Sequence, residues 1–76
     1  MKDLIEYMAK QLVDKPDDVK VTEETERGRV IVRLEVAEDD YGKVIGKGGR
    51  IAQSMRALLK VAAVRSEEYA SLEIGD

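Results

Sequence analysis

Three glycines fall within four consecutive positions in the middle of the chain, in the stretch Gly46-Lys47-Gly48-Gly49. Glycine lowers helix stability and adopts backbone dihedrals that other residues resist, so we expect no regular helix to run through this stretch. Helical spacing is nevertheless present on both sides. Tyr41, Val44 and Ile45 share one side of a short helix before it, and a longer amphipathic segment follows from residue 51. The fold must therefore accommodate two helices joined by a bare glycine loop.

The longer helix after the glycines has an apolar face and an opposing polar face. The predicted apolar face comprises Ile51, Met55, Leu58, Leu59 and Ala62, and the polar side carries Gln53, Arg56 and Lys60. We expect a connecting loop at residues 65–68. Ahead of the shorter helix, Asp39 or Asp40 is placed to act as its N-cap.

Periodicity also assigns the remaining segments. Residues 2–13 repeat apolar side chains at helical spacing, and Pro16 ends that helix. A short strand around Val19 and Val21 leads to a turn at 26–28, and residues 30–36 alternate as the clearest strand. The last strand covers residues 69–74. The predicted order is α-β-β-α-α-β.

That order predicts an α+β fold with a three-stranded mixed sheet. The first two strands should form an antiparallel hairpin, and the second and third, joined through two helices, should run parallel. Three helices would then pack on one face of the sheet. Ile31 interrupts the polar side of the long strand, which indicates a central strand partly covered on both faces.

Composition excludes several classes of function. The length of 76 residues suits one small domain, residues 1–76. Cysteine and histidine are both absent, which removes disulfides, thiolate metal sites, the commonest general base and the commonest metal ligand. No apolar run approaches the roughly 20 residues that a membrane span needs. We expect a cytoplasmic protein that is not an enzyme and uses no cofactor.

Charge is segregated along the chain. The net charge is −3, but residues 1–41 sum to −5, residues 42–65 to +6 and residues 66–76 to −4. The middle block contains no acidic residue; its basic residues are Lys43, Lys47, Arg50, Arg56, Lys60 and Arg65. Such a local positive field can attract a polyanion in spite of the net charge. A solvated helix face is an equally plain interpretation of the same block.

The glycine loop leads into a helix start, and this combination is suited to a phosphate. Unpaired backbone N–H groups and a partial positive charge lie at the beginning of a helix, and glycine leaves the main chain open to a ligand. The P-loop and dinucleotide motifs do not fit, because the lysine lies inside the glycines and a helix, not a strand, precedes them. A G-x-x-G loop between two helices is typical of KH domains, which clamp about four nucleotides of single strand. A tight glycine corner that only lets two helices pack is the structural alternative.

The stretch from Val44 to Ile51 resembles the V-I-G-x-x-G-x-x-I signature of KH domains, with the last isoleucine one place early and Ala52 at the expected position. The element order is similar to that of the type II KH fold. Residues 12–17 and 42–46 resemble the bacterial single-KH proteins of the KhpA family, and the likeness extends over essentially the whole chain.

The resemblance implies a site with two walls around a narrow cleft that admits single strands. The first wall would consist of Lys43, Ile45, Gly46, Lys47, Gly48, Gly49 and Arg50. The second would include the region of Arg65, Ser66 and Leu72. Whether Arg56 and Lys60 extend the phosphate track or only solvate their helix stays open.

The resemblance further implies a non-enzymatic binder of single-stranded RNA with low sequence specificity. Members of the family pair with themselves and with a larger multidomain KH protein (KhpB, also called Jag), and are associated with RNA chaperoning, cell-envelope growth and cell shape. The sequence alone does not distinguish RNA from single-stranded DNA. The alternative function is a protein-interaction or dimerisation module with a vestigial cleft, for which the edge strand near Val19 and Val21 is a candidate surface.

Overall fold

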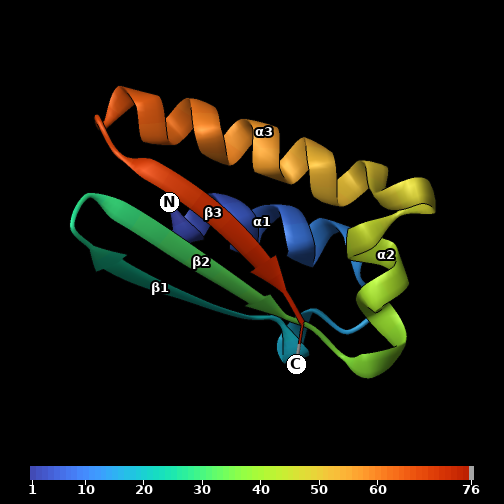
Figure 1. The fold of residues 1–76 in the computed structure, drawn as a ribbon. Coiled ribbons are helices and arrows are strands. Elements are labelled where there is room, and N and C mark those ends of the chain that lie inside the picture. Colours follow the sequence, from blue (N-terminus) through green and yellow to red (C-terminus); the bar gives the residue numbers. More distant parts are fainter. Residues whose placement is uncertain (76) are drawn as a thin grey trace.

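Three α-helices and three strands form in the predicted order (Figure 1). The computed structural model describes residues 1–75. The elements are α1 (Lys2–Leu12), β1 (Lys20–Glu26), β2 (Arg29–Glu35), α2 (Tyr41–Ile45), α3 (Arg50–Arg65) and β3 (Tyr69–Ile74). Short 3-10 turns occupy Pro16–Asp18, Glu38–Asp40 and Lys47–Gly49. The α-β-β-α-α-β order of the type II KH fold is therefore confirmed.

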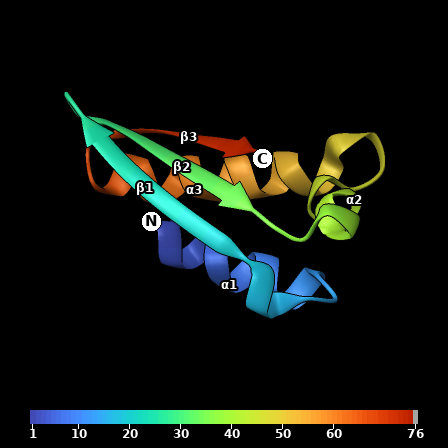
Figure 2. The same cartoon turned by 90° about the horizontal axis from the view of Figure 1, so that it is seen from below.

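The sheet has the strand order β1-β2-β3. Its first pair is antiparallel, with Val21 opposite Leu34, and its second pair is parallel, with Val32 opposite Leu72. Both orientations are as predicted. Figure 2 shows α1 and α3 side by side beneath the sheet and α2 beyond one end of it, so the opposite face of the sheet is left open.

The core lies between the sheet and the helices. Its largest fully buried apolar side chains are Ile5, Leu34, Met55, Leu59, Val32 and Val44. Alternation along β2 explains two of these six, because Val32 and Leu34 point to the helix-covered face while Arg33 points to the open one. Ile31, on the open face, is half-buried, as its place in the central strand indicated.

The apolar face predicted for α3 is wrong at two positions. Leu58 is 47% exposed and Ala62 is only half-buried. The buried stripe consists of Ala52, Met55, Leu59 and Ala63. Because alanine side chains are small, α3 can lie close to the sheet when Ala52 and Ala63 face it. The helix is therefore rotated so that Leu58 lies outside the buried stripe. As a result, three apolar residues face solvent on the outside of α3: Leu58, Val61 and Val64.

Helix α3 ends later than expected, and the hairpin turn is one residue shorter than expected. Helix α3 continues through Arg65, which the sequence had placed in the connecting loop. The β1–β2 turn is built from Arg27 and Gly28, with φ values of 53° and 76°, as in a type I′ hairpin. Among residues 1–75, no helix is long and apolar enough to cross a membrane.

Candidate nucleic-acid interface

The glycine loop takes a backbone path that favours glycine at three places. Gly46 ends α2 with φ 77°, and Gly48 and Gly49 have φ values of 65° and 76°. These values lie in the left-handed region, which side chains with a Cβ rarely adopt. Between them, Lys47–Gly49 makes one 3-10 turn, and α3 begins directly at Arg50. The loop therefore changes the chain direction within four residues and places the start of α3 beside the end of α2 (Figure 1).

Gly46 is required for space as well as for its dihedral angles. A Cβ at this position would lie 2.6 Å from Cγ1 of Ile51. Ile51 packs against the edge of the core from the first turn of α3, while Ala52 is buried. The KH signature has a single apolar position here, and in this chain two residues take its place. Ile51 packs against Gly46 of the loop, and Ala52 faces the core.

Two amides of the loop remain available to a ligand. Gly46 N–H donates to Gly42 O at 2.9 Å, and Gly49 N–H donates to Gly46 O at 3.0 Å. Within residues 1–75, the N–H groups of Lys47 and Gly48 have no protein acceptor. They lie in the 3-10 turn directly before α3, a 16-residue helix whose dipole favours an anion at this end. Consecutive free amides at a helix start form a phosphate-sized donor group.

Lys47 and Arg50 add full positive charges at the same place. Both side chains are exposed, and neither forms an ion pair with any residue of the described chain. Ile45 is 40% exposed at the end of α2 and supplies an apolar surface next to them. The structure thus brings together six of the predicted residues, Ile45, Gly46, Lys47, Gly48, Gly49 and Arg50.

Lys43 differs from these cations because its charge is already paired. Its Nζ lies 3.2 Å from Oδ2 of Asp14 and 3.5 Å from Oδ1 of Asp40. These ion pairs raise the pKa of the Lys43 ammonium, the bond with Asp14 contributing most. Lys43 therefore links α2 to the loop after α1 through ion pairs, and its charge is not free for a ligand.

Asp40 is the buried partner in this arrangement, with 1% of its surface exposed. The sequence had placed it among surface or capping carboxylates, but it makes no side-chain cap. Its Oδ2 instead accepts a hydrogen bond from the Lys15 backbone N–H at 3.1 Å. Burial acts to raise the pKa of Asp40, but the N–H groups of Lys15 and Asp14 and the Lys43 ammonium together outweigh burial and lower it. A charged carboxylate thus fixes α2 to a segment 25 residues earlier in the chain.

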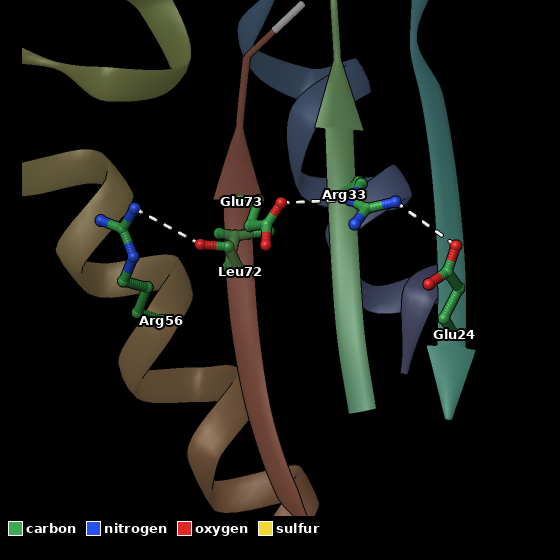
Figure 3. A network of polar contacts seen from close by, with 5 residues as sticks. All are labelled: Glu24, Arg33, Arg56, Leu72 and Glu73. Carbon is green, nitrogen blue, oxygen red and sulfur yellow. Dashed lines mark hydrogen bonds and ion pairs between the residues drawn. The ribbon is translucent and has the colours of Figure 1, made fainter. Parts of the chain in front are cut away.

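A groove lies between α3 and β3, where the second wall was expected. Figure 3 shows Arg56 reaching from α3 to β3, where its guanidinium donates to the Leu72 carbonyl at 3.4 Å. A depression of about 120 Å³ is lined there by Arg56, Lys60, Ala70 and Ser71, among others. The Leu72 side chain is buried, so this residue offers only its backbone to the groove. The groove thus offers a guanidinium, an ammonium and strand backbone.

Arg65 and Ser66 do not converge with the loop. Arg65 is the last residue of α3, about 22 Å along the helix axis from Arg50. Ser66 follows in the turn toward β3. The groove beside Arg56 is therefore formed without them. Ser71 and Ala70, which the sequence did not single out, line the groove instead, and strand alternation beside Leu72 is the signal that could have found them.

A separate depression of about 410 Å³ has the opposite charge character. Its lining includes Asp17, Asp18, Glu35 and Glu38 with Lys20 as the one basic residue. Such a surface repels phosphate. Among residues 1–75, no group of acidic side chains is arranged to hold a metal ion.

Comparison with known proteins assigns the fold and the loop to one family. The KH-domain model of KhpA/KhpB matches residues 2–74. The RNA-binding protein KhpA of Clostridium acetobutylicum is 50% identical over 74 residues, covering 97% of this chain and 99% of the relative. The protein of the same name from Treponema pallidum is 48% identical over 75 residues, covering 99% and 94%.

A third relative, the RNA-binding protein KhpA of Halalkalibacterium halodurans, is 43% identical over 76 residues and matches along 100% of both chains. No solved structure matches this chain to a significant degree. The glycine loop, the element order and these full-length similarities agree, and the chain belongs to the KhpA/KhpB family of KH domains.

Proposed function

We propose that this chain binds single-stranded RNA through the glycine loop at the start of α3. The observation that carries the proposal is the pair of unpartnered amides at Lys47 and Gly48, flanked by the free charges of Lys47 and Arg50. A phosphate held by these amides would receive hydrogen bonds and charge compensation together. The names of the relatives, which describe RNA-binding proteins, support RNA as the polyanion.

The bases would extend from the loop into the groove between α3 and β3. Ile45 supplies an apolar surface for the first base. Farther along, Arg56 and the backbone of β3 provide donors and acceptors for base edges. Both walls are protein elements in close contact, so the site suits one strand rather than a duplex.

One such module has a small footprint. About four nucleotides in a KH cleft correspond to weak affinity, of about micromolar Kd, with low sequence specificity. Linking a second module would raise the effective affinity without new contacts. We therefore propose that the protein acts in the cytoplasm as an RNA chaperone or post-transcriptional regulator, either as a homodimer or with a larger KH protein such as KhpB.

A charge reversal in the loop tests the RNA site directly. Lys47→Asp combined with Gly48→Asp should abolish retention of a single-stranded RNA, because phosphate would face two carboxylates. The fold should survive, since no atom lies within 4 Å of a Cβ at Gly48 and aspartate tolerates positive φ better than most residues. Lys20→Asp, which reverses one charge on the exposed β1 strand, is the control for the lysine substitution. Unchanged retention by a folded loop variant would refute the proposal.

A second candidate function, protein interaction, is favoured by the outer face of α3. Leu58, Val61 and Val64 are all substantially exposed there, on the side away from the core. The edge of β1 is a poorer surface for self-association, because Glu23, Glu24 and Glu26 would oppose like charges in a second copy. If the outer face of α3 joins two copies, Val61→Glu should halve the mass measured by light scattering. Self-association that occurs without RNA and is the same in the Lys47→Asp/Gly48→Asp variant would favour this function.

A further inference from the structure

We infer that the bound RNA strand runs beyond the four-nucleotide cleft, along the seam between α3 and β3, to a second contact point formed by Tyr69, Arg27 and Arg29. This inference rests on the proposed function and extends its site. At the second contact point a base stacks on the Tyr69 ring, and the two guanidinium groups hold the neighbouring phosphates.

Tyr69 is an exposed aromatic ring at a well-fixed position. It is the first residue of β3 and 81% of its surface is accessible. Its backbone N–H donates to Gly28 O at 2.9 Å, which joins the start of β3 to the β1–β2 turn. A depression of about 340 Å³ opens there on the uncovered side of the sheet and is lined by Arg27, Arg29, Ile31, Tyr69 and Ser71, among others. An exposed ring beside a hollow can accept a base on its face.

The depression at Tyr69 adjoins the groove beside Arg56. Between them lies a hollow of about 210 Å³, lined by Lys60, Val64, Glu68 and Tyr69, among others. This hollow shares Lys60 with the groove beside Arg56 and shares Tyr69 with the depression at the hairpin turn. Moving from Leu72 back to Tyr69 along β3 adds about 10 Å of path. The adjoining hollows mark a track that leads from the seam between α3 and β3, past the start of β3, to the uncovered side of the sheet.

Charge along this track favours a polyanion. Lys60, Arg27 and Arg29 form no ion pair with any residue among 1–75. The next arginine on the same sheet face, Arg33, is by contrast bound to Glu24 and Glu73 (Figure 3). Among residues 1–75, Glu68 is the one carboxylate that lines the track. Unpaired guanidinium groups are therefore confined to the end of the sheet where Tyr69 lies.

Arg27 occupies a position that arginine does not suit conformationally. Its φ of 53° places a long side chain in the left-handed region, where Asn, Asp or Gly is usual in this type of turn. Arginine at this position does not stabilise the hairpin. Its positive charge could instead contact a phosphate. The track thus combines an aromatic ring, unpaired cations and adjoining hollows. A single nucleic-acid strand, whose bases and phosphates alternate, matches this combination better than a folded protein surface does.

The test measures binding of a short and a long RNA by fluorescence anisotropy with the whole chain. The short probe is an oligouridylate of about four nucleotides, which fills one KH cleft. The long probe is an oligouridylate of about ten nucleotides, within the range that single-strand grooves cover. We expect Tyr69→Ala to weaken the long probe about fivefold or more while leaving the short probe within about twofold. Tyr69→Phe should bind both like the unmodified chain.

Two controls separate the possible outcomes. Tyr7→Ala removes an equally isolated tyrosine, 67% exposed on α1, and should change neither affinity. The loop variant Lys47→Asp/Gly48→Asp should weaken both probes. If the loop variant weakens both probes and Tyr69→Ala weakens neither, or both equally, the extended track is wrong and the loop site stands. If the loop variant changes neither probe, the proposed function itself fails. Arg27→Ala combined with Arg29→Ala should repeat the length dependence of Tyr69→Ala.

Discussion

The carboxylate of Asp40 and the backbone N–H of Lys15 lie 3.1 Å apart and join the loop after α1 to the start of α2. Lys43, one turn later in α2, pairs with both Asp40 and Asp14 across the same junction. The short helix α2 has only five residues and would not be stable alone. Its position, and with it the glycine loop that follows, depends on this buried carboxylate and on the core contact of Val44.

Asp40→Ala should therefore lower the melting temperature by about 5 °C or more, because it leaves the partly buried Lys15 amide without its acceptor and removes one of the two carboxylates paired with Lys43. RNA affinity should fall as well, but less than in the Lys47→Asp/Gly48→Asp variant. Loss of Asp40 would displace the glycine loop, whereas its positive charges would remain.

Asp39→Ala is the matched control. That neighbouring side chain is 86% exposed and makes one contact of 3.9 Å, so both readouts should match the unmodified chain. Equal effects of the two substitutions would contradict the role given to Asp40.

Gly46→Ala should destabilise the fold by about 1–3 kcal/mol, because the added Cβ meets Ile51 and the backbone has a positive φ. Gly42→Ala gives the opposite expectation: this glycine lies in α2 with nothing within 4 Å of a Cβ, and alanine should stabilise by about 0.5–1 kcal/mol. Urea unfolding monitored by circular dichroism measures both. Destabilisation by both changes, or by neither, would show that the loop geometry is not the cause.

Acid should unfold the protein partly through two carboxylates. The pKa of Asp40 is lowered as described, and the pKa of Glu23 is lowered mainly by the hydrogen bond from the Lys2 backbone N–H, with the N-terminal ammonium adding to it. Because both values are lowered in the folded state, the stabilisation is fully present above the unfolded values of about 4 and is lost as pH falls through the folded values. Melting temperatures between pH 6 and pH 3 should decline less steeply in Asp40→Asn and Glu23→Gln. A decline as steep in both variants as in the unmodified chain would contradict the role given to these two carboxylates.

Local periodicity was sufficient to predict the order of the elements, the strand pairing and the loop between two helices. It was insufficient for α3, because Leu58 and Ala62, which periodicity placed on the apolar face, are not fully buried, whereas Ala52 and Ala63 are. Only the close approach of α3 to the sheet selects the alanine stripe. Asp40 was missed for a related reason: its partner lies 25 residues away, and no short-range pattern marks such a contact. Membership of the KhpA/KhpB family agrees with the expectation that the chain is not an enzyme.

The salt dependence of RNA binding should separate free cations from the paired one. Each phosphate neutralised on a single strand contributes about 0.7 to the slope of log affinity against log salt. Lys47→Ala and Arg50→Ala should each reduce the slope by roughly that amount, because their charges face solvent without a protein partner. Lys43→Ala should leave the slope unchanged and lower the melting temperature instead, since Asp14 and Asp40 already neutralise its charge. A slope reduced equally by all three substitutions would place Lys43 on the RNA and show that its ion pairs open on binding.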